Sequence, residues 1–233
     1  MSRCIARQLN EGGAVAELVF HTGPMDCGKS TLALQMHFTQ SQHGRQGRLF
    51  TRQDRSGRPA VTSRLGLSLE ALEVDDEFNF WAFVIRELTH AKRVDYLICD
   101  EAQFYTAEQI DELARIVDEL QIDVYAFGIL ADFRTRLFPG SQRLVELADR
   151  METLPLGPLC WCGNKGTHNA RTVDGKMVTE GSQVEVGDTA DGGEQTIRYE
   201  VLCRLHHRRK VTKAMAQATL SPDPLPFDND AWT

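Results

Sequence analysis

The hydrophobic pattern of the first 150 residues predicts alternating strands and helices. Short apolar runs predict buried strands at residues 18–21, 49–51, 94–99 and 124–129. Helices are expected at residues 29–42, 76–91, 106–120 and 141–149, three of them from apolar residues at helical spacing. Alternation of this kind indicates an α/β domain with a parallel sheet and helices on both of its faces.

Local signals refine this pattern. Thr106 and Gln109 have the spacing of a capping box, which predicts the start of the third helix. Residues 52–70 are rich in Arg, Ser and Gly and predict a long loop, which in a compact domain is usually functional or disordered.

The pattern changes after about residue 150. Glycines, closely spaced cysteines and alternating segments at residues 183–186 and 197–202 predict a small β-ribbon domain held by a metal. We therefore expect a flexible arm at residues 1–14, an α/β domain at residues 15–153, a ribbon domain at residues 154–212 and a flexible tail at residues 213–233.

Composition narrows the class of protein. The chain has 233 residues, of which 42% are apolar and 25% charged, as in ordinary globular proteins. The net charge of −7 argues against a nucleic acid as the main partner, although the basic stretch at residues 204–210 fits phosphate attraction and a solvated surface equally well. Neither a signal peptide nor a long apolar run is evident, so we expect a cytoplasmic protein without a membrane partner.

The segment GPMDCGKS at residues 23–30 carries the first chemical information. It matches the phosphate-binding pattern GxxxxGK[ST] (the P-loop) and lies between a predicted strand and a predicted helix, as that pattern requires. Lys29 would reach the β- and γ-phosphates, and the Ser30 hydroxyl would bind Mg²⁺. The sequence therefore predicts a nucleoside triphosphate site, with ATP as the expected ligand.

Asp100 and Glu101 end the apolar strand at residues 94–99. Ligands collect at the carboxyl ends of parallel strands, so Asp100 can hold Mg²⁺ beside Ser30 and Glu101 can act as a general base. On their own, two acids at a strand end more often begin a solvated loop; the P-loop in the same sheet favours the functional interpretation. The residues do not distinguish hydrolysis from phosphoryl transfer.

Four late residues, Cys160, Cys162, Cys203 and His206, predict a structural zinc site. The C-x-x-H pair has good ligand spacing, whereas the first two cysteines are one residue closer than in the commoner CxxC. His207 could replace His206, but the spacing favours His206. The alternative is that the cysteines are reduced and buried singly.

Three ordered motifs then resemble a known family. GPMDCGKS, DEAQF at residues 100–104 and GILADFRTRLFPGSQ at residues 128–142 are similar to the cytosolic-type (class II) thymidine kinases, in a bacterial-like form, over roughly residues 15–210. The resemblance implies transfer of the γ-phosphoryl of ATP to the 5′-hydroxyl of deoxythymidine, and also of deoxyuridine, in nucleotide salvage for DNA synthesis. It further implies a homotetramer and feedback inhibition by deoxythymidine triphosphate, neither of which the residues show.

The resemblance also implies roles by position. Glu101 would take the 5′-hydroxyl proton, Asp100 and Ser30 would serve Mg²⁺, and a loop would cover the nucleoside and read it through its main chain. Phe133 would stack on the thymine ring, although on its own this residue would be interpreted as core. The implied ATP-binding residues are Gly23, Pro24, Met25, Asp26, Cys27, Gly28, Lys29, Ser30, Thr31, Asp100 and Gln103. The implied nucleoside-binding residues are Phe104, Phe133, Val184, Glu185, Val186, Gly187, Asp188 and Tyr199.

Some positions depart from the family or stay open. Cys27 stands where the family often has serine, and residues 187–195 look longer than the corresponding turn, which puts the closure of that loop in doubt. Arg55 and Arg64 fit two interpretations equally, as cations that close over ATP or as ordinary surface arginines.

Rival functions are disfavoured by specific features. A zinc-ribbon ATPase that binds nucleic acid conflicts with the acidic charge and with the few aromatic residues of the ribbon. A regulatory GTPase would need an N-K-x-D motif, whereas Asn164-Lys165 is followed by Gly166-Thr167. A kinase for a purine deoxynucleoside is disfavoured because a site shaped for a pyrimidine excludes purines by size.

Overall fold

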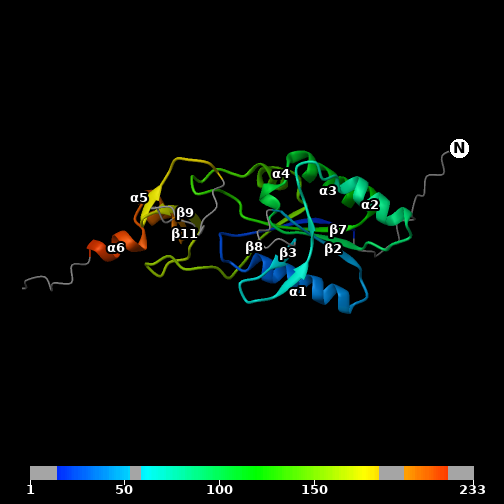
Figure 1. The fold of residues 1–233 in the computed structure, drawn as a ribbon, viewed down its shortest axis with the longest axis horizontal. Helices are drawn as coiled ribbons and strands as arrows, with labels where there is room; N and C mark the ends of the chain where they lie inside the picture. The colour runs from blue at the N-terminus through cyan, green and yellow to red at the C-terminus, as the bar shows by residue number, and fades with distance from the viewer. Residues whose placement is uncertain (1–14, 53–58, 184–196, 220–233) are drawn as a thin grey trace, which may run out of the picture.

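The computed structural model of the chain describes residues 15–52, 59–183 and 197–219. The predicted N-terminal arm and most of the predicted tail lie outside these ranges. Figure 1 shows an α/β domain on one side and a smaller unit on the other, joined by extended chain.

A six-stranded parallel sheet forms the centre of the larger domain. Its spatial order is β5 (Leu72–Glu73), β2 (Gly47–Thr51), β6 (Tyr96–Cys99), β7 (Asp123–Gly128), β1 (Leu18–Thr22) and β8 (Arg150–Thr153). All neighbouring strands in this order pair in parallel, which confirms the predicted fold class. The carboxyl ends of β1, β6 and β7 therefore lie at the same edge of the sheet.

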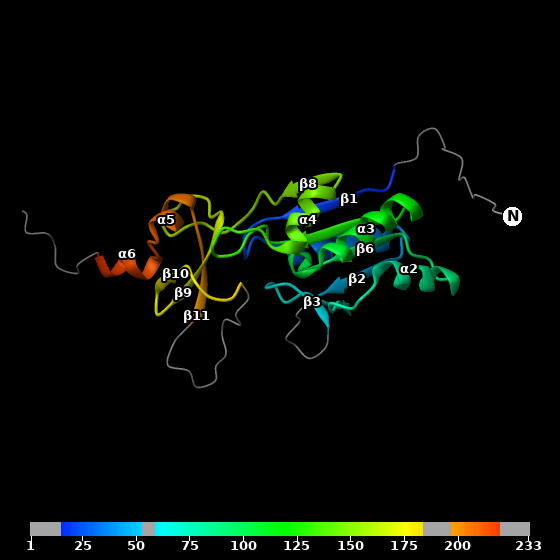
Figure 2. The ribbon, with the colours of Figure 1, turned by 90° about the horizontal axis from the view of Figure 1, so that it is seen from above.

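Helices cover both faces of this sheet. Figure 1 shows α1 (Lys29–Gln42) on one face and α2 (Phe80–Thr89), α3 (Ala107–Leu120) and α4 (Pro139–Leu147) on the other, and Figure 2 looks down on the face that carries α2, α3 and α4. Each face has its own apolar core. All four residues of β6 are buried because alternate side chains enter opposite cores, Tyr96 and Ile98 on the α1 side and Leu97 and Cys99 on the other.

Capping side chains set the helix limits. The predicted capping box starts α3: the Gln109 backbone N–H donates to Thr106 Oγ1 (3.2 Å) and the Thr106 N–H to Gln109 Oε1 (3.1 Å). The second helix begins at Phe80 rather than at residue 76, because the Asn79 side chain accepts from the Ala82 N–H and caps it there. Phe78 still packs against the core, so its apolar character reflects burial outside the helix.

Several strand pairings of the α/β domain were not predicted. Within the expected 52–70 loop, β3 (Ala60–Thr62) pairs antiparallel with β4 (Ser68–Glu70). At the sheet edge, β8 pairs in parallel with β1. Residues 53–58 of the expected loop lie outside the described ranges.

The smaller unit is a three-stranded antiparallel sheet in the order β10 (Lys176–Val178), β9 (His168–Val173) and β11 (Ile197–Leu202). Two short helices follow, α5 (Arg204–Arg209) and α6 (Lys213–Thr219), so the first seven residues assigned to the flexible tail are helical. In the described part of the chain, the helices all fall short of the length and apolar character that crossing a membrane requires.

Candidate functional site

A cavity of about 1050 Å³ lies at the carboxyl edge of the parallel sheet, between the P-loop and the ribbon domain. Its walls include residues 25–31 after β1 and residues 100, 101, 103 and 104 after β6. Asp132 and Phe133 follow β7, while Asn169 and Tyr199 come from the ribbon domain. The fold thus brings the predicted phosphate, acid and nucleoside residues to one cavity, at the sheet edge where α/β folds bind ligands.

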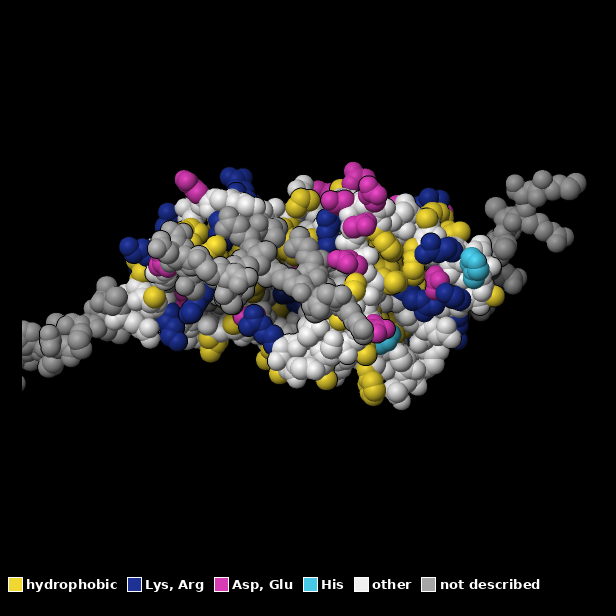
Figure 3. Space-filling view, in the orientation of Figure 1, with side chains coloured by type: hydrophobic (Ala, Val, Ile, Leu, Met, Phe, Trp, Pro, Cys, Tyr) yellow, Lys and Arg dark blue, Asp and Glu magenta, His cyan; other side chains and the backbone are white. Residues whose placement is uncertain are grey.

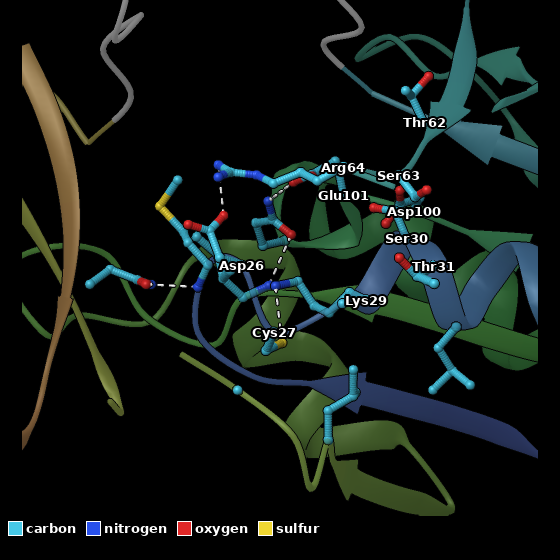
Figure 4. A pocket seen from close by; sticks show the side chains of 18 of the residues that line it. Asp26, Cys27, Lys29, Ser30, Thr31, Thr62, Ser63, Arg64, Asp100 and Glu101 are labelled. Carbon is cyan, nitrogen blue, oxygen red and sulfur yellow. Dashed lines mark hydrogen bonds and ion pairs between the residues drawn. The ribbon is translucent and has the colours of Figure 1, made fainter. Parts of the chain in front are cut away.

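The P-loop is folded around its own lysine. Helix α1 begins directly after Gly28, whose φ of 87° lies in the left-handed region that favours glycine. Lys29 Nζ donates to the carbonyls of Pro24 (2.8 Å) and Gly23 (3.3 Å) and lies 3.7 Å from Cys27 Sγ (Figure 4). The carbonyls of Gly23 and Pro24 therefore hold the Lys29 side chain in place, while residues 25–31 line the cavity.

Asp100 lies beside Ser30 at the start of α1 (Figure 4). Burial, and then the negative charge of Glu101, raise the pKa of Asp100 to about 7, and a hydrogen bond from the Ser30 side chain opposes this rise. Asp100 is 3% exposed, and its Oδ1 is a buried atom without a hydrogen-bond partner. A buried carboxylate with an unused oxygen beside a hydroxyl suits a hard cation such as Mg²⁺.

Glu101 points away from Asp100 because its backbone turns. Its φ of 53° is left-handed, which is uncommon for a residue other than glycine, and the chain enters the short helix η1 (Ala102–Phe104) directly afterwards. Gln103 Nε2 donates to Glu101 Oε2, and Gln103 Oε1 accepts from the Ile129 N–H (3.2 Å). The glutamine, held by the end of β7, therefore orients the Glu101 carboxylate at the cavity wall.

Arg64 extends towards the P-loop from the β3–β4 hairpin. Its Nη2 lies 2.7 Å from Asp26 Oδ1 (Figure 4), and its side chain is 76% exposed. A solvated ion pair of this kind contributes at most about 1 kcal/mol. The ion pair places the Arg64 guanidinium at the mouth of the cavity. Arg55, the other arginine that could close over ATP, lies outside the described residues.

Phe133 is contacted by two side chains of the ribbon domain, Arg171 on its ring and His207 on its carbonyl. Its ring is 2% exposed, and the Arg171 guanidinium carbon lies 4.0 Å from the ring centroid. Arg171 also donates to the carbonyls of Glu180 (2.6 Å) and Ser182 (2.9 Å). His207 Nε2 lies 3.0 Å from the Phe133 carbonyl oxygen. One face of the predicted stacking ring is therefore covered by a cation from β9.

Of the predicted nucleoside-binding residues, Phe104, Phe133 and Tyr199 line the cavity. The predicted loop residues Val184, Glu185, Val186, Gly187 and Asp188 lie outside the described ranges. Asn169 and Arg171 were not predicted from the sequence, because polar residues in a glycine-rich region lack any distinctive spacing.

The predicted metal ligands come together in the ribbon domain. Ligand atoms of Cys160, Cys162, Cys203 and His206 all lie within 4.8 Å of one another. The sulfurs of Cys160 and Cys203 are each 3.4 Å from His206 Nδ1. His207 faces Phe133 instead, as the spacing argument favoured. Three thiols and one imidazole around one point form a donor set that suits tetrahedral zinc.

The family model and the curated relatives that match this sequence agree on one family. A family model described as thymidine kinase matches residues 16–207. A thymidine kinase of Cutibacterium acnes is 63% identical over 92% of this chain and 98% of its own length. A thymidine kinase of Streptomyces coelicolor is 60% identical over 90% of this chain and 97% of its own length. One of Legionella pneumophila strain Lens is 38% identical over 84% of this chain and 90% of its own length. A solved structure of the Pif1 helicase from Candida albicans aligns with 60% of this chain and 36% of its own chain, at 16% identity and a TM-score of 0.37. This similarity is too low to support any conclusion about fold or function.

Proposed function

This chain belongs to the thymidine kinase family, and we propose that it transfers the γ-phosphoryl of ATP to the 5′-hydroxyl of deoxythymidine, and also of deoxyuridine. The observation that carries the proposal is the composition of the cavity. The P-loop and the Asp100–Glu101 pair line the same space as Phe104, Phe133 and Tyr199, so a triphosphate and a flat pyrimidine can meet there.

The P-loop side would bind ATP. Lys29 and the backbone N–H groups at the start of α1 would hold the phosphates, and Arg64 would add positive charge from the cavity mouth. Ser30 and Asp100 would hold Mg²⁺, which neutralises the charge that develops during transfer of the phosphoryl group. Positioning and positive charge supply most of the catalysis in this class of reaction.

Glu101 would act as the general base for the 5′-hydroxyl. Its carboxylate lines the cavity and is oriented by Gln103, so it can accept the proton while the hydroxyl oxygen attacks the phosphorus. Asp100, the buried neighbour, is committed to Ser30 and the cation. Aromatic contacts with the base would come from Phe104, Phe133 and Tyr199.

The ribbon domain would carry a structural zinc ion held by Cys160, Cys162, Cys203 and His206. With four protein ligands, zinc would have no open position for substrate. It would fix α5, and through His207 the Phe133 carbonyl, so that the metal supports the nucleoside side of the cavity. A homotetramer, a cytoplasmic location and feedback inhibition stay predictions from the family resemblance.

Nucleic acid is a less suitable partner. On the face shown in Figure 3, acidic side chains gather over α3 and α4, and the Lys and Arg side chains lie in separate groups towards the two ends of the molecule. Nucleic-acid binding needs a continuous basic surface, so this face supports the small-molecule proposal.

The proposal is tested by measuring ADP formation by the purified protein with Mg²⁺·ATP and each common nucleoside in turn. We expect ADP to form with deoxythymidine and deoxyuridine, together with an equal amount of the 5′-monophosphate, and not with purine nucleosides. ADP formation that ignores nucleosides but increases with DNA or RNA would refute the proposal and favour a nucleic-acid-dependent ATPase.

A further inference from the structure

Asn169 in β9 bonds to both halves of the cavity through a single amide. Its Oδ1 accepts from the backbone N–H of Met25 in the P-loop (2.8 Å), and its Nδ2 donates to the backbone carbonyl of Ala131 (3.2 Å). These partners are 144 and 38 residues away along the chain. The side chain is buried at 7% exposure and lies in the cavity wall.

The chemistry of these two bonds requires an amide. One partner is a donor and the other an acceptor, and an asparagine side chain supplies both an acceptor oxygen and a donor nitrogen at one carbon. A leucine of similar shape supplies neither, so it would leave the Met25 N–H and the Ala131 carbonyl without this partner. Both bonds go to backbone atoms, so they constrain the path of the chain on each side.

Side chains of β9 and α5 also contact Phe133, two residues after Ala131. Arg171, two positions along the strand, covers the Phe133 ring at 4.0 Å, and His207 bonds the Phe133 carbonyl at 3.0 Å. Gln183 Nε2 also donates to Asp132 Oδ2 (3.3 Å), so residues 131–133 are fixed to the ribbon domain at four points. Within the described part of the chain, Asn169 contacts residues 131–133 and also accepts a hydrogen bond from the P-loop.

We infer that Asn169 is a positioning residue that sets the distance between the ATP-binding loop and the nucleoside-binding wall. The inference rests on the proposed function, because it assigns ATP to the P-loop and the nucleoside to residues 131–133. In-line transfer needs the attacking oxygen and the phosphorus about 3–3.5 Å apart, and a misplacement of about 1 Å can cost roughly 100-fold in rate. Asn169 would therefore affect the reaction between two bound substrates more than the binding of either one.

The test replaces Asn169 and separates turnover from binding. For Asn169→Leu we expect kcat with deoxythymidine to fall by about 10- to 100-fold. The dissociation constants of deoxythymidine alone and of a non-hydrolysable ATP analogue alone, measured by titration calorimetry, should change by less than about threefold. Asn169→Gln keeps the amide but moves it by one methylene, so we expect a smaller loss of kcat with the same unchanged affinities.

Thr172→Val provides the matched control. Thr172 is also a buried polar residue of β9, but its Oγ1 donates to the Arg198 carbonyl (3.2 Å) inside the ribbon domain. This variant should lose comparable thermal stability and keep its kcat.

Two results would overturn the inference in a protein that phosphorylates deoxythymidine. One is a folded Asn169→Leu or Asn169→Gln variant with unchanged kcat. The other is a loss of deoxythymidine affinity as large as the loss of kcat, which would make Asn169 a simple nucleoside contact. Failure of the proposed function is distinct, because the unchanged protein would then show no nucleoside-dependent phosphorylation.

Discussion

Asp100 and Glu101 are adjacent in the sequence and have different surroundings in the structure. Asp100 is buried beside Ser30, whereas Glu101 is half-buried and bonded to Gln103. The left-handed backbone of Glu101 separates the two carboxylates. Different environments for two neighbouring acids allow one to serve a cation and the other to take a proton.

The first prediction concerns Asp100 and pH. Its folded-state pKa is raised to about 7, against about 3.9 for an unperturbed aspartate, so burial lowers stability increasingly as pH rises from 4 to 7. Asp100→Asn should therefore stabilise the protein, by up to about 4 kcal/mol at pH 8 and clearly less at pH 5. Urea unfolding of both proteins at the two pH values, without Mg²⁺ or nucleotide, measures this difference. An equal gain at pH 5 and pH 8 would contradict it.

The second prediction concerns the general base. Glu101→Gln should lower kcat by about 10²- to 10⁴-fold, because an amide cannot accept the proton of the 5′-hydroxyl. The affinities for ATP and deoxythymidine should stay close to those of the unchanged protein, since the side chain keeps its size. Steady-state kinetics together with equilibrium binding tests this, and near-native turnover would remove Glu101 from the role.

Elements were predicted correctly where burial and local signals coincide. Helix α3 has both an apolar face and a capping box, and β6 is an uninterrupted apolar run buried on both sides. Strand β9 was missed because its buried positions include Asn169, Arg171 and Thr172. These residues are polar because they bond to the site and the ribbon, so a hydrophobic pattern cannot identify the strand.

Exposed elements were missed for a different reason. All three residues of β4 are exposed, and β8 is a mostly exposed edge strand. Strands of this kind show no apolar alternation, and only their backbone partners define them. The P-loop, the acid pair and the metal ligands were predictable because each has residue types at a spacing tied to its chemistry.

The third prediction separates the two histidines of α5. His206→Gln should reduce bound zinc, because Nδ1 of His206, 3.4 Å from the sulfurs of Cys160 and Cys203, would be the fourth ligand atom. His207→Gln should keep zinc and weaken deoxythymidine binding by about 3- to 10-fold, the usual range for one lost hydrogen bond. Elemental analysis and nucleoside titration of both variants test this assignment. Zinc loss in His207→Gln with zinc retained in His206→Gln would reverse it.

At the scale of the whole molecule, the cavity is shared by two units with different sources of stability. The α/β domain has two apolar cores, whereas the apolar core of the ribbon domain includes Cys160 and Cys203. We therefore expect a unit with so small a core to depend on a metal for its stability. The nucleoside side of the cavity would therefore depend on the ribbon, whereas the phosphate side is built on the α/β domain and is linked to the ribbon through the bond from the Met25 N–H to Asn169.

The fourth prediction follows from this division. Removal of zinc by a chelator should abolish deoxythymidine binding and lower the unfolding temperature of the ribbon domain. Affinity for an ATP analogue should fall much less, because residues 23–31 belong to the α/β domain. Calorimetric scanning and separate titrations of the two ligands before and after chelation provide the measurement. Equal loss of both affinities would contradict the division.

The bonds of Lys29 have a kinetic consequence. The lysine is held by the Pro24 and Gly23 carbonyls, so contacts within the loop maintain its shape. Arrival of ATP would then exchange one set of bonds of Lys29 for another and require no ordering of the P-loop. The observed association rate of ATP should accordingly grow in proportion to its concentration, without the plateau that a slow rearrangement before binding would impose.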